Sequence, residues 1–400
     1  TPVDSSWGTR SDFNGDGKDD LVANERLGDR NGVADVYWGR PGGINATPDQ
    51  VVPKDTVTGN LFATLLRSAP DVNGDGFADL VVGGPQVLVY HGGPTGFPNE
   101  PSSRIPAPAG ADSFGDRVDG VGDLNLDGFG DIAVTTRYRS WVFLGSASGV
   151  SGTPSITLNP GPGTGEYGRN VSRAGDVNGD GYADFFVGTT RASNSNSINC
   201  MYFGAPGGLS STECSFGDSG GSVPSPPGTF LDDVNGDGYA DTGAIVGTGF
   251  VQVMLGGSPW TGSPVVSWTV SFADGARTLA SAGDINHDGK SDVIVGLDSL
   301  HWNEVYIYLG RSSTGGASGP PSLILYGETA DRTGLFGSSV LSRDLNADGF
   351  DDMIVSSPSF NLGTLFIYNG GASGLATTPT MTLTPAGGSG FAGFGSLVAA

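Results

Sequence analysis

Nine-residue segments rich in carboxylate and amide oxygens recur along the chain, and their spacing is suited to holding a metal ion. The pattern is D-x-N-x-D-G-x-x-D, and it occurs without a substitution at the oxygen-bearing positions at residues 12–20, 71–79, 123–131, 176–184, 233–241, 284–292 and 344–352. Successive starts are separated by 59, 52, 53, 57, 51 and 60 residues. A regular period of this kind is typical of solenoids, propellers and arrays.

Oxygen ligands at alternate positions, with a glycine at the sixth position where the chain must turn, suit a calcium-sized cation. Side chains at positions one, three, five and nine and the backbone carbonyl at position seven would supply these oxygens. The predicted ligands are Asp12, Asn14, Asp16, Lys18, Asp20; Asp71, Asn73, Asp75, Phe77, Asp79; Asp123, Asn125, Asp127, Phe129, Asp131; Asp176, Asn178, Asp180, Tyr182, Asp184; Asp233, Asn235, Asp237, Tyr239, Asp241; Asp284, Asn286, Asp288, Lys290, Asp292; and Asp344, Asn346, Asp348, Phe350, Asp352.

A simpler interpretation is that Asp, Asn and Gly merely form tight turns. A turn needs one or two such residues, whereas three carboxylates at fixed spacing repel one another unless a cation neutralises them. We therefore predict up to seven structural Ca²⁺ ions, in preference to Mg²⁺, which retains water and demands stricter octahedral geometry. Each segment runs into a short β-branched strand, so a helix–loop–helix site is excluded.

The composition favours strands and argues against several partners. The 400 residues include 69 glycines and 25 prolines, and the net charge is −23. Nucleic-acid binding depends on Lys and Arg that neutralise phosphates, so we expect no nucleic-acid partner. No apolar run reaches the roughly 18 residues of a membrane-spanning helix. Positions one, five and nine of the seven segments hold 21 of the 42 Asp and Glu residues, so the acidity is concentrated in them.

Two cysteines, Cys200 and Cys214, flank a glycine-rich turn. If Ala205 to Gly208 forms the turn of a hairpin, the two cysteines face each other, and facing residues of antiparallel strands are close enough for a disulfide. We favour the bridge, and two buried free thiols remain the alternative.

The sequence pattern of each repeat predicts four short strands. Four-stranded sheets that repeat radially are propeller blades. We therefore predict an all-β fold, a single domain over residues 1–400 with seven blades of four antiparallel strands. The ends of the chain support ring closure. An aromatic–Gly pair stands eight or nine residues before several of the acidic segments, but Phe394 has only six residues after it. The C-terminal strand is expected to complete the N-terminal blade, which leaves no open sheet edge.

The aromatic–Gly strand, the acidic loop and the following apolar strand resemble FG-GAP repeats, the units of the integrin α-subunit propeller and of many secreted bacterial proteins. This resemblance covers essentially the whole chain. It implies a seven-bladed propeller with a calcium loop between the first and second strands of each blade, and a secreted or extracellular location. The fifth repeat departs from the pattern, because Phe230-Leu231 lies too near Asp233.

The stretch GDSGG at 217–221 matches the nucleophile signature of trypsin-like proteases. A serine nucleophile at Ser219 needs a histidine base and an orienting carboxylate. The three histidines lie in unsuitable contexts, and prolines follow where a helix would be required. We therefore predict no catalytic residues and no enzyme activity, with a secreted hydrolase as the third-ranked function.

The connections opposite the acidic loops carry the most varied residues, and loops on a rigid scaffold commonly carry function. The candidate ligand face contains Arg26, Arg137, Tyr138, Arg139, Arg191, Trp302 and Arg332. Solvated loop residues are the alternative for any one of them. We predict a monomeric, calcium-loaded module for protein binding or cell adhesion, with an extracellular protein or glycan as its ligand. A carbohydrate-binding lectin is the alternative function.

Overall fold

The computed structural model describes residues 11–26, 32–53, 55, 65–159, 164–191, 197–216, 229–246, 250–258, 265–271, 276, 278–299, 302–312, 320–327, 335–359, 363–385, 394 and 398–399. Within these residues the chain forms 28 strands joined by turns and loops, without a helix. The described residues contain no helix that is long and apolar enough to cross a membrane.

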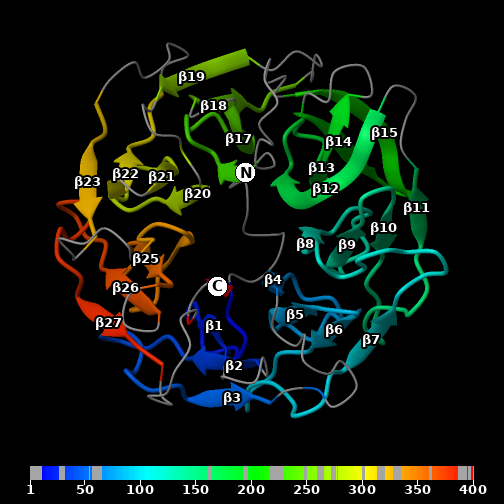
Figure 1. Cartoon of the computed structure of the whole chain (residues 1–400), viewed down its shortest axis with the longest axis horizontal. Coiled ribbons are helices and arrows are strands. Elements are labelled where there is room, and N and C mark those ends of the chain that lie inside the picture. The colour runs from blue at the N-terminus through cyan, green and yellow to red at the C-terminus, as the bar shows by residue number, and fades with distance from the viewer. Residues whose placement is uncertain are drawn as a thin grey trace.

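The strands form seven four-stranded antiparallel sheets, which are the blades of a propeller (Figure 1). Blade 1 contains β28 (Val398–Ala399), β1 (Leu21–Arg26), β2 (Gly32–Tyr37) and β3 (Gln50–Val52). Blade 2 contains β4 (Leu65–Ala69), β5 (Asp79–Gly83), β6 (Gln86–Tyr90) and β7 (Ser103–Pro106). Blade 3 contains β8 (Val118–Gly122), β9 (Asp131–Thr135), β10 (Ser140–Phe143) and β11 (Ile156–Leu158). Blade 4 contains β12 (Thr164–Gly175), β13 (Asp184–Arg191), β14 (Ser197–Ala205) and β15 (Gly208–Phe216).

The remaining three blades follow the same order. Blade 5 contains β16 (Thr229–Asp232), β17 (Asp241–Val246), β18 (Phe250–Leu255) and β19 (Val265–Ser271). Blade 6 contains β20 (Thr278–Gly283), β21 (Asp292–Ser299), β22 (Trp302–Tyr308) and β23 (Leu323–Tyr326). Blade 7 contains β24 (Val340–Arg343), β25 (Asp352–Ser357), β26 (Thr364–Tyr368) and β27 (Met381–Leu383). Blade 5 therefore has a first strand, β16, in spite of its atypical sequence.

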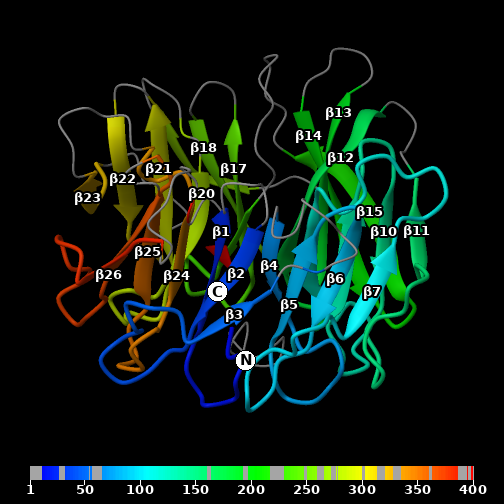
Figure 2. The same ribbon diagram turned by 60° about the horizontal axis from the view of Figure 1, so that its bottom comes forward.

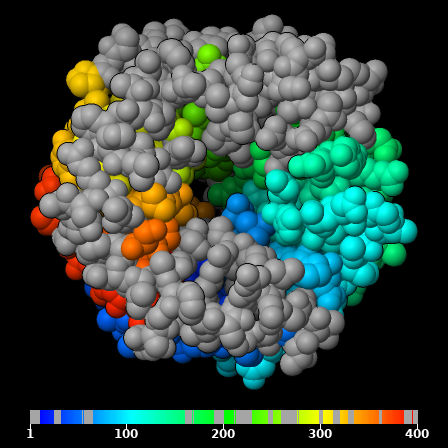
Figure 3. All heavy atoms as spheres, viewed as in Figure 1, coloured from blue at the N-terminus to red at the C-terminus, as the bar shows by residue number. Residues whose placement is uncertain are grey.

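The two ends of the chain meet in blade 1, as the sequence predicted. Strand β28 pairs antiparallel with β1, with Val22 opposite Ala399 and Ala23 opposite Val398. Both strands lie near the centre of the ring, where the C-terminus is marked in Figure 1. A space-filling view shows a narrow hollow at the centre (Figure 3). Closure gives blade 1 its fourth strand and packs blade 7 against blade 1, so that both terminal repeats have a neighbour on each side.

The hydrophobic core is divided among the joints between blades. The described residues form seven buried clusters, and each combines side chains of two adjacent blades. The closing joint is packed like the others, because Leu21 and Tyr37 of blade 1 share a cluster with Ile354 and Leu365 of blade 7 and with Phe394. Packing across joints, rather than within a blade, is what holds neighbouring sheets face to face.

Blade 4 contains the cysteine pair. Cys200 of β14 faces Cys214 of β15, and Ala205 pairs with Gly208 across the tight turn. Cys200 is fully buried and disulfide-bonded. The chain contains only these two cysteines.

Candidate metal centres in the acidic loops

In blades 2 to 7 the acidic segments form loops that join the first strand of the blade to the second. In blade 1 the segment precedes β1, and β28, from the other end of the chain, supplies the first strand. We number them loops 1 to 7 with their blades, from residues 12–20 to residues 344–352. Because strands alternate in direction, these loops lie on the same face as the connections between third and fourth strands (Figure 2). The connections between second and third strands, and those from one blade to the next, lie on the opposite face.

The first aspartate of each loop organises the backbone around itself. In loop 2, Oδ1 of Asp71 accepts the N–H groups of Gly74 and Asp75 at 2.6 and 3.1 Å, and Oδ2 accepts the N–H of Gly76 at 2.6 Å. The bond from the sixth residue to Oδ2 occurs in all seven loops, at 2.6 to 2.9 Å. The sixth residue is always a glycine with a positive φ, for example 92° at Gly76, a conformation that other residues adopt at a cost.

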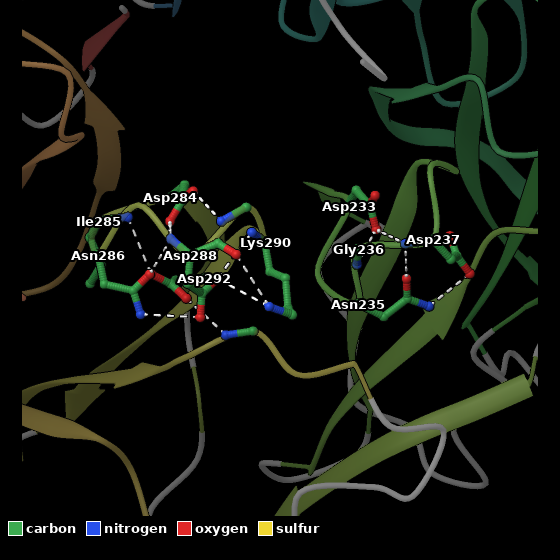
Figure 4. Close-up of polar contacts among 12 residues, drawn as sticks. Asp233, Asn235, Gly236, Asp237, Asp284, Ile285, Asn286, Asp288, Lys290 and Asp292 are labelled. Carbon is green, nitrogen blue, oxygen red and sulfur yellow. Dashed lines mark hydrogen bonds and ion pairs between the residues drawn. The ribbon is translucent and has the colours of Figure 1, made fainter. Parts of the chain in front are cut away.

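The fifth residue continues this pattern. Its Oδ1 accepts the N–H of the seventh residue at 3.0 to 3.1 Å in every loop. In loops 1 and 6 the seventh residue is a lysine, and its Nζ lies 3.2 Å from Asp16 Oδ2 and 3.4 Å from Asp288 Oδ1, respectively. Figure 4 shows the loop 6 contact beside loop 5. In these two loops, the lysine ammonium group therefore places a positive charge beside the fifth carboxylate.

The ninth residue is a buried aspartate that joins its loop to the hairpin between the third and fourth strands. Its Oδ2 accepts the N–H of the second loop residue at 2.8 to 3.2 Å in all seven blades. Its Oδ1 accepts the N–H of a glycine at or just after the end of the third strand at 2.8 to 3.0 Å, again in all seven. The aspartate is at most 1% exposed in every blade.

The glycines that follow the third strands were not recognised as part of the site from the sequence. They are Gly39, Gly92, Gly145, Gly204, Gly256, Gly310 and Gly370. A Cβ atom at any of them would lie 2.2 to 2.5 Å from the carbonyl oxygen of the eighth loop residue. The glycine lets the hairpin come close enough to donate to the buried aspartate. The signal in the sequence is a glycine near the end of the third strand, at a variable distance from the loop.

Burial raises the pKa of the ninth aspartate. Desolvation is the main cause, the two backbone N–H donors oppose it, and the first and fifth aspartates add repulsion. The pKa is raised to about 8 for Asp20, Asp79 and Asp241, and to about 7 for Asp131, Asp292 and Asp352. The pKa of Asp184 is also raised well above its ordinary value. Negative charge is therefore costly at these positions unless a positive charge lies nearby.

The donor set of the loops fits a hard divalent cation, since all of its side chains are carboxylates or amides. Within the described parts of the chain, however, no group of three or more His, Cys, Asp or Glu side chains has the arrangement of a formed metal site. Backbone N–H groups bind the carboxylates instead.

One loop contains an oxygen that lacks a partner. Asn346 of loop 7 is only 7% exposed; its Nδ2 donates to Asp352 Oδ1 at 3.2 Å, and its Oδ1 has no hydrogen-bond partner among the described residues. In loops 1 to 6 the corresponding Oδ1 accepts the N–H of the fifth residue at 2.8 to 3.3 Å. A buried acceptor without a partner is costly, so loop 7 has an oxygen that a cation would satisfy.

The candidate ligand face is only partly described. Arg137, Tyr138 and Arg139 lie in the exposed β9–β10 connection, and Tyr138 is 56% exposed. Arg26, Arg191 and Trp302 belong to strands β1, β13 and β22, but their side chains lie outside the description. Arg332 and Ser219 fall outside the described residues altogether. Among the residues whose side chains are described, the candidate face is represented by one exposed Arg-Tyr-Arg segment.

Fold and loops together define the class of protein, a closed seven-bladed β-propeller with an acidic loop in each blade. Comparison of the sequence with known families matches residues 62–97 and 336–374 to the FG-GAP repeat and residues 123–187 to the FG-GAP-like repeat. The propeller thus contains FG-GAP and FG-GAP-like repeats, consistent with an FG-GAP β-propeller.

Integrin α subunits are among the similar curated proteins. The chain is 34% identical to integrin alpha-PS5 of Drosophila melanogaster over 145 residues, which are 31% of this chain and 14% of that protein. It is 30% identical to integrin alpha-6 of Gallus gallus over 168 residues, 37% of this chain and 15% of the relative. The match therefore spans about a seventh of these relatives' length.

Solved structures support the fold. A chain in the crystal structure of BBS1N in complex with ARL6DN, soaked with lead, superposes with a TM-score of 0.54 at 12% identity. The superposition covers 89% of this chain and 91% of that one. At this level of identity the likeness concerns the fold alone.

Proposed function

We propose that this chain is a secreted, single-domain propeller over residues 1–400, stabilised by Ca²⁺ in its acidic loops, that binds an extracellular protein. The observation that supports this proposal most directly is the seven-fold repetition of an oxygen-only donor set beside a buried aspartate of raised pKa. The similarity to integrin α subunits supports the protein-binding role.

The cation would be held by the first, third and fifth side chains and the seventh carbonyl, with the ninth aspartate beneath them. Bound Ca²⁺ supplies positive charge among carboxylates that otherwise repel one another. A ligand that binds only the native state stabilises it by mass action. Thermal unfolding in 1 mM CaCl₂ and in excess EGTA tests this part, and an unchanged midpoint would contradict it.

The exposed Arg-Tyr-Arg segment 137–139 is the described part of the proposed ligand surface. In a chain of net charge −23, two arginines beside an exposed aromatic are suited to an anionic patch on a protein, because aromatic and Arg side chains dominate binding at interfaces. The triple variant Arg137→Ser, Tyr138→Ser, Arg139→Ser should lose binding without loss of stability.

A panel of purified extracellular proteins and a glycan array, probed with the native chain and with the triple variant, tests the ligand class. Binding to a protein that the variant loses supports the proposal. Binding confined to glycans would replace it with a lectin function, which the tyrosine beside arginines also suits. A variant that binds the same proteins equally well would exclude this segment as the ligand surface.

A further inference from the structure

Each acidic loop contacts the neighbouring blade around the ring, through that blade's own acidic loop or through its hairpin. The carbonyl of the second loop residue accepts an N–H from the hairpin of the next blade at 2.8 to 3.1 Å at six of the seven joints. One of these bonds, from Arg40 to Leu345, crosses the closing joint between blades 7 and 1 at 3.1 Å. At five joints the carbonyl of the first loop residue also accepts the N–H of the eighth residue of the next loop, at 2.7 to 3.3 Å.

Side chains reinforce these joints. The seventh residue of one loop packs over the fourth residue of the preceding loop, so a Cβ atom added at Gly15 would lie 2.3 Å from the ring of Phe77. The same relationship joins Gly74 to Phe129 and Gly179 to Tyr239, at 2.6 and 2.4 Å. Between loops 5 and 6, Lys290 takes this place beside Gly236 (Figure 4).

The joint between loops 6 and 7 uses different groups for the same purpose. The backbone N–H of Asp284 donates to Asp351 Oδ2 at 3.0 Å. His287 Nδ1 lies 3.2 Å from the carbonyl oxygen of Gly349, and the His287 and Phe350 rings meet edge to face with centroids 5.6 Å apart. Every joint of the ring therefore has at least one hydrogen bond between a loop and its neighbouring blade.

These contacts connect the candidate cation ligands directly. At those five joints, the first loop residue offers its carboxylate to the loop interior and its carbonyl to the eighth residue of the next loop, which precedes the next buried aspartate. An ion that holds the carboxylate also holds that carbonyl. Charge acts in the opposite sense, since an ion in one loop lowers the attraction for the next. Salt screens charges at the exposed loop surface over about 8 Å at physiological ionic strength, whereas the hydrogen-bonded contacts persist.

We propose that the loops bind divalent cations as a coupled ring, in which occupancy of one loop raises the affinity of its two neighbours. This inference rests on the calcium binding proposed above. Coupling of this kind is reciprocal, and typical coupling free energies correspond to changes in affinity of about 5- to 150-fold.

A ligand deletion in one loop tests the coupling at its neighbours. In Asp237→Ala, loop 5 loses its fifth-position carboxylate, while loops 4 and 6 keep all of their own ligands. Amide hydrogen exchange of peptides from each loop, measured across a calcium titration in 0.15 M salt, reports each midpoint. We expect the loop 6 midpoint to rise at least about fivefold, while loop 2, across the ring, keeps its native midpoint.

The joint between loops 6 and 7 provides a second variant that should fold without difficulty. His287 has a φ of 59°, so His287→Gly relieves backbone strain and removes the contacts with Gly349 and Phe350. The titrations of loops 6 and 7 should become less steep, while those of loops 2 and 3 are unchanged. Tyr326→Ala, at a 64% exposed side chain on outer strand β23, is the matched control and should change none of them.

The outcomes separate the two proposals. Midpoints at loops 4 and 6 that do not move in Asp237→Ala, with calcium still protecting those loops, would overturn the coupling and leave calcium binding intact. An exchange pattern that calcium changes in no loop would overturn both. A fall in the loop 6 midpoint in Asp237→Ala would show that charge repulsion outweighs the contacts, and would also overturn the coupling.

Discussion

Oδ1 of Asp79 accepts the backbone N–H of Gly92 at 2.9 Å, and this bond joins the end of an acidic loop to a hairpin 13 residues further along the chain. The other carboxylate oxygen of Asp79 accepts the N–H of Val72 at 2.8 Å. One buried side chain thus satisfies two backbone donors from separate segments. The same arrangement occurs in all seven blades, so the ninth loop aspartate is a structural element of the fold as well as a candidate ligand.

Asp79→Asn is expected to destabilise the protein strongly. The amide keeps one acceptor, but its NH₂ group must face a backbone N–H of Val72 or Gly92, which leaves buried donors unsatisfied at a cost of about 1–3 kcal/mol. The matched control is Asp75→Asn, at an exposed position of the same loop. Urea unfolding of both variants in metal-free buffer at pH 4, where the folded Asp79 carboxyl is protonated and its replacement removes no charge, measures the difference. Equal losses would contradict the assigned role of Asp79.

Gly92→Ala should be destabilising even though the residue adds only a methyl group. The new Cβ would lie 2.3 Å from the carbonyl oxygen of Ala78 and 2.7 Å from that of Phe13, and overpacking of this kind costs about 1–3 kcal/mol. Gly207→Ala is the control, because nothing lies within 4 Å of its Cβ position. A Gly92→Ala midpoint in thermal unfolding equal to that of the control would refute the close approach.

Phe394→Ala tests whether the closing joint is packed like an internal one. Phe394 and Phe336 are each 1% exposed and lie in the clusters that join blades 7 and 1 and blades 6 and 7. Replacing a buried Phe by Ala costs about 3–5 kcal/mol. We expect similar losses for Phe394→Ala and Phe336→Ala in chemical unfolding. A loss at Phe394 well below that at Phe336 would mean that the ring closes weakly.

The metal-free protein should lose stability as the pH rises from about 4 to about 8. The ninth aspartates have pKa values of about 7 to 8 in the folded chain and about 3.9 in the unfolded chain. Between these values the folded state binds more protons, so the free energy of unfolding falls with increasing pH. Thermal midpoints measured in EGTA across this range test the sign, and calcium should flatten the dependence.

Lys290→Met should increase the calcium affinity of loop 6. The Lys290 ammonium lies 3.4 Å from Asp288 Oδ1, where it competes with a cation for the carboxylate. An exposed ion pair is worth about 0–1 kcal/mol, so the gain should be no more than about fivefold. A calcium titration followed by exchange of the loop 6 peptide measures it, with Lys54→Met, outside the acidic loops, as the control. A lower affinity would show that the lysine does not compete.

The sequence alone determined the number of blades, the place of each acidic loop and the closure of the ring, because these features follow from local patterns repeated at a regular spacing. The seven matches to D-x-N-x-D-G-x-x-D predicted the number of blades. The short segment after Phe394 predicted the pairing of β28 with β1. The cysteines were placed opposite each other from the turn between them.

Only the tertiary structure decided which groups surround the loops. The glycines at the ends of the third strands lie 13 residues (Gly92) to 20 residues (Gly204) after the aspartates to which they donate. Because this distance varies, no fixed spacing in the sequence predicts the hydrogen bond between glycine and aspartate. The contacts between loops join residues about fifty positions apart, as Phe77 and Gly15 show. The physical reason is that these contacts depend on how neighbouring blades pack against each other. The repeated sequence pattern predicts the strands and loop of each blade, but it does not predict the distance between two blades.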